Sequence, residues 1–175
     1  MTVRVQEADF DLGAELAALR AGDARVGALA SFLGLVRDLN GGASVAEMTL
    51  EHYPGMTEKA LEEIVAEAKA RWDIYDALVI HRIGPLKPCD QIVLVAVTSA
   101  HRGEAFAACE FIMDYLKTRA PFWKREQSAD GAHWVDARDA DDTAAARWQS
   151  ASRLSEPSPS LPVTTPAGLR RKPIG

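Results

Sequence analysis

The stretch QIVLVAVTSAHRGEAFAACEFIMDYLKTRAPFWKRE, residues 91–126, decides the fold. It opens with an apolar run of strand length, QIVLVAVTS, and Gly103–Lys117 then repeats apolar residues at helical spacing. The predicted apolar face of this helix consists of Phe106, Cys109, Ile112, Met113 and Leu116. Pro121 ends the helix, and we expect Phe122 and Trp123 to anchor a turn in the core. A buried strand that leads into an amphipathic helix indicates a mixed α and β domain.

Further strands and helices flank this stretch. The patterns predict strands at 3–6, 27–37, 46–53, 77–84 and 133–138, and helices at 11–20 and 57–72, the second capped by Thr57. The Asn-Gly-Gly turn in DLNGG, residues 38–42, predicts a hairpin tip or a mobile loop. Adjacent strands with short connections favour an α+β fold with mostly antiparallel pairing.

The composition changes after about residue 150. Residues 151–175 contain five of the nine prolines of the chain and show no hydrophobic period. We therefore expect a single domain over 1–150 and a flexible Ser/Pro-rich tail over 151–175.

The overall composition argues against several classes of protein. The formal net charge is −5, which disfavours general affinity for nucleic acids or anionic membranes. No apolar run approaches 18 residues, so no bilayer span is expected. Cys89 and Cys109 are too few for a disulfide framework, and no secretory signal opens the chain. The prediction is a cytoplasmic protein, and the spacing of its histidines indicates no metal site.

Positive charge is nevertheless concentrated in one segment. Residues 99–125 hold five Lys/Arg against three Asp/Glu, a net of +2, so the rest of the chain carries −7. Lys117 has a structural explanation, because a cation complements a helix C-terminus. Lys124 and Arg125 follow the proline turn at once, and that explanation does not cover them. The concentration predicts an anion site, with a solvated helix end as the alternative.

Three further cations stand at the ends of predicted strands. His101 and Arg102 lie where a buried strand passes into a helix, a position that binds anions through unpaired N–H groups. Cations there oppose the helix dipole, so a purely structural explanation is awkward. Arg37 ends the strand FLGLVR, where it either pairs with a carboxylate such as Asp38 or grips a phosphate in a bidentate manner.

Six stretches occur in one order between Val3 and Arg138: FLGLVR, LEHYPGM, HRIGPL, SAHRGEAF, LKTRAPFWKRE and WVDAR. Together they resemble the large, catalytic subunit of molybdopterin synthase. The resemblance implies an α/β hammerhead-like domain with an additional, mostly antiparallel sheet. It also implies sulfur transfer to cyclic pyranopterin monophosphate, which becomes the dithiolene molybdopterin.

The resemblance implies partners but no cofactor. The sulfur comes from a small ubiquitin-like carrier subunit whose C-terminal Gly-Gly ends as a thiocarboxylate. Two large subunits form a homodimer with one small subunit at each outer end, giving a heterotetramer. Clustered cations would lower the repulsion between the substrate phosphate and the anionic donor.

Site residues also follow from the resemblance. It gives Lys117 and Lys124 as the catalytic pair, with Lys117 polarising the thiocarboxylate and Lys124 supporting the oxyanion or a proton transfer. The substrate-binding set comprises Leu35, Val36, Arg37, His101, Arg102, both lysines, Arg125 and Glu126.

Two rival functions stay open. Cys89 in KPCD is predicted to be exposed and could carry a persulfide in a different kind of sulfurtransferase. A non-catalytic adaptor that only binds a phosphometabolite would need the same cluster of cations.

Overall fold

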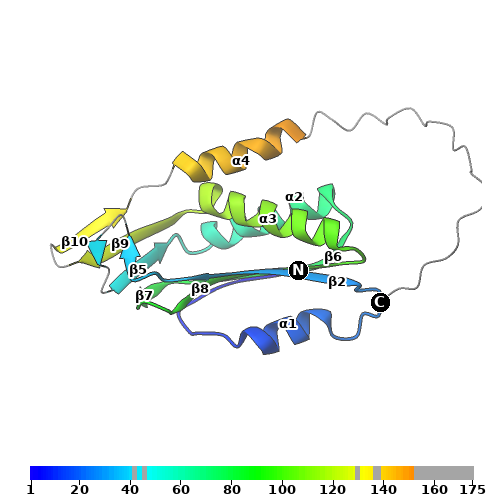
Figure 1. Cartoon of the computed structure of the whole chain (residues 1–175), viewed down its shortest axis with the longest axis horizontal. Helices are drawn as coiled ribbons and strands as arrows, with labels where there is room; N and C mark the ends of the chain where they lie inside the picture. Colours follow the sequence, from blue (N-terminus) through cyan, green and yellow to red (C-terminus); the bar gives the residue numbers. More distant parts are fainter. Residues whose placement is uncertain (41–42, 45–46, 129–130, 136–138, 152–175) are drawn as a thin grey trace, which may run out of the picture.

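The computed structural model describes residues 1–40, 43–44, 47–128, 131–135 and 139–151. Its first sheet has the strand order β1 (Thr2–Gln6), β6 (Ile74–Arg82), β8 (Gln91–Ser99) and β2 (Ala28–Leu35). β1 is parallel to β6, and the other neighbours are antiparallel. α2 (Met56–Arg71) and α3 (Arg102–Arg119) cover one face, and α1 (Leu12–Arg20) covers the other (Figure 1).

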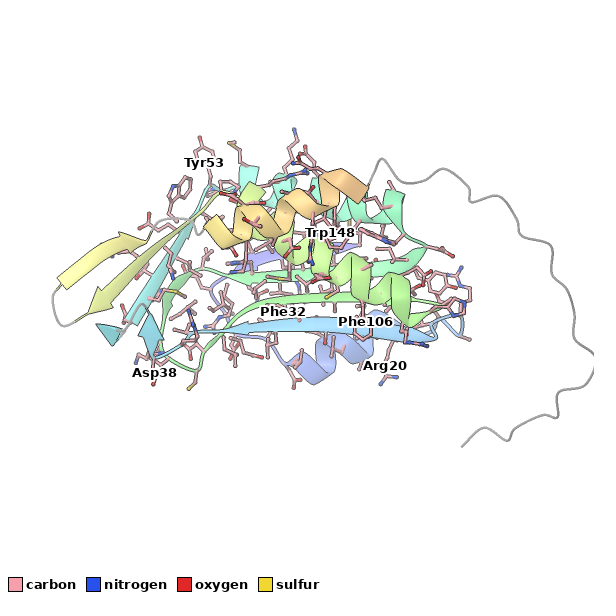
Figure 2. All side chains as sticks on the ribbon, turned by 45° about the horizontal axis from the view of Figure 1, so that its top comes forward. Arg20, Phe32, Asp38, Tyr53, Phe106 and Trp148 are labelled. Atoms are coloured by element: carbon pink, nitrogen blue, oxygen red, sulfur yellow. The ribbon has the colours of Figure 1, made fainter. Side chains whose placement is uncertain are left out.

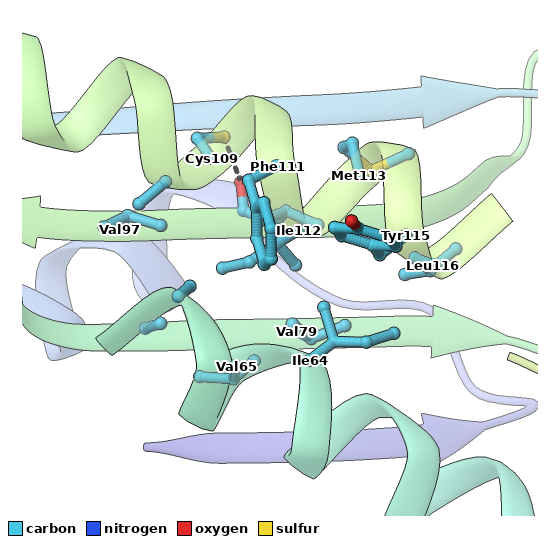
Figure 3. Packing of buried hydrophobic residues seen from close by; sticks show 14 of the residues in the cluster. Ile64, Val65, Val79, Val97, Cys109, Phe111, Ile112, Met113, Tyr115 and Leu116 are labelled. Carbon is cyan, nitrogen blue, oxygen red and sulfur yellow. Dashed lines mark hydrogen bonds between the residues drawn. The ribbon is translucent and has the colours of Figure 1, made fainter. Parts of the chain in front are cut away.

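The two central strands are apolar without interruption because both of their faces are buried. Alternate residues of β6 and β8, including Val79 and Val95, face the helix pair, and the residues between them, including Ile80 and Leu94, face α1. Figure 3 shows α3 packing its apolar side onto this sheet and α2. The core is therefore one sheet enclosed by two helical layers.

A second, wholly antiparallel sheet extends from one end of the first (Figure 1). Its order is β10 (Gly131–Val135), β9 (Phe122–Ser128), β5 (Glu47–His52) and β7 (Gly84–Leu86). The short strands β3 (Leu39–Asn40) and β4 (Ala43–Ser44) pair as the arms of a hairpin, whose tip lies outside the described residues. The predicted α+β fold with an added antiparallel sheet is confirmed.

Three local predictions were wrong. Phe106 is 65% exposed and does not belong to the buried face of α3. Phe122 and Trp123 open a strand, β9, that pairs with β5 and is not a turn; Phe122 packs against the core as expected, whereas Trp123 is exposed. Thr57 does not cap α2: Gly55 is the N-cap, its amide donates to Glu58 Oε2 at 2.7 Å, and the Thr57 hydroxyl bonds elsewhere.

A fourth helix, α4 (Asp139–Ala151), was not predicted. It lies on the outer side of α3, where the Trp148 indole donates to Asp114 at 2.7 Å and packs edge-on against Phe111. Apart from Ala151, which ends this helix, the predicted tail lies outside the described residues. Across the described part of the chain, no helix is both long and apolar enough to cross a membrane.

Candidate anion site

The predicted cationic residues fall into two groups at opposite ends of the first sheet. Arg37 follows the end of β2, whereas His101 and Arg102 follow the end of the antiparallel strand β8. The eight residues of β2 keep these ends roughly 23 Å apart. In Figure 2, Asp38, the neighbour of Arg37, lies far from Phe106 in the early part of α3. A single chain therefore does not bring all the predicted site residues together.

Lys117 lies at the same end as Arg37 because α3 runs back along the sheet. The 18 residues of α3 span about 27 Å, which is the length of the strands beneath it. Lys117 occupies the last turn and is exposed. It is close enough to His81, near the end of β6, to help lower the pKa of that histidine. Lys117 thus lies where the two sheets meet.

Lys124 reaches the same junction from the second sheet. It lies directly opposite Leu50 of β5, and cross-strand neighbours project from the same face of a sheet. Leu50 packs with Val36, the residue before Arg37. Lys124 is half-buried on this inner face. Lys117 at the end of α3, Lys124 on β9 and Arg37 after β2 therefore all belong to the end of the molecule where the two sheets join.

Leu35 and Val36 differ in what they can offer a ligand. Leu35 is 49% exposed, whereas the Val36 side chain is buried. The Val36 amide donates to the Asp90 carbonyl and its own carbonyl accepts from the Cys89 amide, both at 2.9 Å. The Val36 backbone therefore holds the turn between β7 and β8, and its N–H is already used.

The remaining predicted residues of β9 alternate along the strand. Arg125 is exposed and lies opposite Thr49, on the face away from Lys124. Glu126 pairs with Met48 in the backbone register. Both belong to the strand that carries Lys124.

The second cationic group surrounds the start of α3. His101 is the N-cap residue with extended backbone angles, and its amide donates to Ser99 Oγ at 3.4 Å. The side chains of His101 and Arg102 are both exposed. A helix N-terminus that carries an exposed arginine and an exposed histidine is a candidate anion site.

Exposed apolar side chains lie between the two cationic groups. β2 is the edge strand of the first sheet, and α3 packs beside it. Phe32 on β2 is 43% exposed, and Phe106 on α3 is exposed near the other end (Figure 2). An edge strand flanked by exposed aromatics indicates an interface with another protein surface.

His81 and His52 also belong to the lysine junction, although the sequence patterns assigned them no role. The His81 ring is buried and stacks on Phe122, with ring centroids 3.8 Å apart. His52 lies opposite Phe122 in the strand register, and its Nε2 is 3.6 Å from Glu58 Oε1. The sequence held one indication of a role for His81, since a histidine inside the largely apolar strand ALVIHRIG is unusual.

Neither cysteine resembles an activated nucleophile within the described structure. Burial raises the pKa of the Cys109 thiol to about 11, and its Sγ is 3.8 Å from the Val95 carbonyl. Cys89 is exposed, has a positive φ of 75°, and bonds through its backbone to the residue before Arg37. Only Cys89 is placed near the candidate site.

Other parts of the described structure offer little competing chemistry. A cleft of about 560 Å³ lies between α1 and the first sheet, lined by Arg4, Glu15, Tyr75 and Asp76 among others. It is on the face opposite α3 and contains none of the predicted site residues. Among the described residues, no group of three or more His, Cys, Asp or Glu side chains could hold a metal ion.

Known proteins share this sequence and fold. Residues 5–119 match the family model described as MoaE protein. A molybdopterin synthase catalytic subunit from Ralstonia nicotianae is 73% identical over 147 residues, which cover 84% of each chain.

Two solved structures are also similar. The molybdopterin biosynthesis MoaE protein from Burkholderia ambifaria has 62% identity and a TM-score of 0.74, covering 85% of this chain and 97% of that one. Molybdopterin synthase from Staphylococcus aureus has 31% identity and a TM-score of 0.70, covering 75% and 95%.

Proposed function

Because the chain belongs to the MoaE protein family, we propose that it is the catalytic subunit of a molybdopterin synthase and acts as a sulfurtransferase. A small ubiquitin-like subunit supplies sulfur from its C-terminal thiocarboxylate. The acceptor is cyclic pyranopterin monophosphate, which becomes the dithiolene molybdopterin. The curated relatives are named catalytic subunits, which supports an assembly with a second kind of chain.

This proposal is supported by the positions of Lys117, beside His81, and Lys124, opposite Leu50, both near the junction of the sheets at the end of β2 that Arg37 follows. The phosphate of the acceptor and the thiocarboxylate of the donor are both anions, and fixed cations reduce their repulsion. Lys117, from the helix, polarises the thiocarboxylate. Lys124, from the strand, stabilises the oxyanion or assists a proton transfer, and Arg37 holds the phosphate.

A second copy of the chain completes the site. The β2 edges of two copies meet across a two-fold axis, which places the two strands antiparallel. The Arg37 end of one β2 then lies beside the other copy's β8–α3 connection, which carries His101 and Arg102. Phe32 and Phe106 are covered in the same step. The separation of the two groups within one chain supports this arrangement.

The other residues of the site have lesser roles in this proposal. Leu35 and Glu126 line the pocket, Arg125 flanks it from the opposite face of β9, and Val36 supports Arg37 through the neighbouring turn. The homodimer binds one small subunit at each outer end, near the lysines. We also assign the protein to the cytoplasm, because both thiols are free and the proposed partners are cytoplasmic molecules.

Formation of molybdopterin from cyclic pyranopterin monophosphate tests the proposal. The purified chain is mixed with a thiocarboxylated small subunit, and the product is measured after oxidation to a fluorescent pterin. We expect multiple turnovers as fresh donor is supplied. Stoichiometric binding of the pterin without product would show instead a phosphometabolite-binding adaptor.

A rival mechanism is sulfur transfer through a persulfide on Cys89. This cysteine is exposed, and its backbone amide donates to the carbonyl of Val36, the residue before Arg37. A persulfide on Cys89 would deliver sulfur without a thiocarboxylated partner. Replacement Cys89→Ser separates the two mechanisms. Undiminished product formation by the variant eliminates the persulfide route.

A further inference from the structure

His81 is a buried polar side chain that the proposed chemistry does not use. It is 5% exposed and follows Val79 on the helix-facing side of β6. Burial, with smaller effects of Lys117 and His52, lowers its pKa to about 4, so the ring is neutral at pH 7. A neutral imidazole exchanges no proton there, and an aliphatic residue would cost less to bury. Its presence calls for another explanation.

The His81 ring is held in one orientation by its own strand. Nδ1 is 2.8 Å from the carbonyl oxygen of Arg82, which can only accept, so Nδ1 carries the proton. Arg82 is itself fixed, because its guanidinium donates to the carbonyls of Glu7 and Gln91 at 3.1 Å each. The imidazole plane is therefore set by a rigid part of the first sheet.

The same plane supports the second sheet. The His81 and Phe122 rings stack at 3.8 Å with an angle of 18° between their planes. Phe122 is the first residue of β9, two residues before Lys124. The preceding residue, Pro121, accepts a 3.0 Å hydrogen bond from the Thr57 hydroxyl. The start of β9 is thus fixed to both β6 and α2.

We propose that His81 is a positioning residue that acts through Phe122 to hold Lys124 at a set distance from Lys117. The proposal rests on the proposed function of the two lysines. Lys117 belongs to α3, which packs on the first sheet, and Lys124 belongs to β9 of the second sheet. The distance between the two lysines therefore depends on how the sheets are joined. A misplacement of about 1 Å can lower a rate about 100-fold.

Two substitutions separate the contacts of His81. His81→Asn keeps a donor near the Nδ1 position but loses the stacked ring, and His81→Phe keeps the ring but loses the donor. In the molybdopterin assay we expect kcat to fall about 10- to 100-fold in His81→Asn, with both KM values within about threefold. His81→Phe should keep most of the kcat. His81→Leu repeats the loss of stacking if the asparagine variant does not fold.

A double-mutant cycle tests the route through Phe122. In a Phe122→Leu background, His81→Asn should lower kcat no further, because the contact it removes is already absent. The matched control is Ile80→Ala, one residue earlier in β6, whose side chain is buried on the opposite face. It should lower the unfolding temperature at least as much as His81→Asn and leave kcat close to that of the wild type.

Three results would overturn the inference. Wild-type kcat in folded His81→Asn would do so, as would additive losses in the double-mutant cycle. Loss of the acid limb of the pH–rate profile in His81→Phe would show that His81 transfers a proton. The proposed function is tested separately, because Lys117→Ala should lower turnover about 100- to 1000-fold whichever residue stands at position 81.

Discussion

Lys117 and Lys124 are close in sequence but belong to different parts of the fold. Lys117 ends a helix that packs on the first sheet, and Lys124 lies on the inner face of the second. Each has a structural reason to exist, since a lysine suits a helix C-terminus and tolerates a half-buried strand position. These separate reasons do not explain why both lysines lie near the junction of the two sheets.

Substitution of Lys117 distinguishes the structural from the catalytic role. Lys117→Ala should cost only a few tenths of a kcal/mol of stability, as for an exposed helix-end cation, yet lower turnover about 100- to 1000-fold. Lys117→Arg keeps the charge but not the shape, so it should restore activity only in part. Turnover is measured with saturating donor and pterin. Near-normal turnover in Lys117→Ala would remove this lysine from the mechanism.

The buried His81 predicts how stability depends on pH. Its pKa is about 4 in the folded chain against an ordinary 6.5, so only the unfolded chain binds the proton between these values. The contribution to stability is complete above pH 6.5 and declines as the pH falls toward 4, by about 2 kcal/mol at pH 5. Urea unfolding should show this loss in the wild type and not in His81→Phe. Equal pH dependence in both proteins would contradict the assignment.

The sequence was enough to nominate the candidate site residues. It was not enough to predict how these residues are arranged in space. Charge counting and strand ends pointed to Arg37, His101 and the lysines. That Arg37 and His101 lie at opposite ends of antiparallel strands became evident only from the pairing of β2 with β8. His81 escaped notice because burial and stacking are properties of the folded chain.

At the scale of helices and strands, local patterns predicted the core elements and failed at the margins. β6, β8 and α3 are long and periodic, and their positions were predicted closely. β9 was not, because its residues become a strand only by pairing with β5. α4 was missed because its alanine-rich sequence has few apolar residues and depends on contacts of Trp148 with α3. Tertiary contacts determine both elements.

An exposed apolar surface consists of Tyr53 after β5, Met56 at the start of α2 and Trp123 of β9, which precedes Lys124 in the chain. Thr57 joins its parts, since its hydroxyl accepts from the Tyr53 amide at 3.1 Å and donates to the Pro121 carbonyl. We expect a donor whose tail ends near Lys117 to cover this surface.

Met56→Glu tests whether the small subunit covers this surface. The charge should weaken binding of the small subunit about 10-fold or more in calorimetry, because burying it without a partner is costly. Ala17→Glu, on the exposed side of α1, is the matched control and should bind normally. Unchanged binding by Met56→Glu would place the small subunit elsewhere.

At the scale of the whole molecule, antiparallel topology was predictable from the short connections, but the edge strand was not. Sheet order depends on contacts far apart in sequence, as where β1 pairs with β6. The order leaves β2 outermost, with Phe32 exposed. The β2 edge is therefore the surface through which we expect the proposed dimer to form.

Removal of residues 152–175 should leave this assembly intact. α4 is the last described element, and Arg147 and Trp148 hold that helix to Asp114. We therefore expect the truncated chain to sediment as a dimer and to turn over at the wild-type rate. A stop after residue 138 would also remove α4 and should lower the unfolding temperature. Loss of activity in the shorter deletion alone would assign a role to the tail.

The position of β2 at the edge of the sheet has a genetic consequence. If each pocket takes Arg37 from one chain and His101 from the other, Arg37→Ala and His101→Ala damage the contributions of different chains to the same pocket. Mixing the two inactive proteins, with exchange of subunits, should then restore about a quarter of the pockets, because half of the dimers are mixed and each mixed dimer holds one intact pocket. If each pocket instead took both residues from one chain, the same mixture would restore no pocket. Such complementation between alleles would be visible in a cell that carries both.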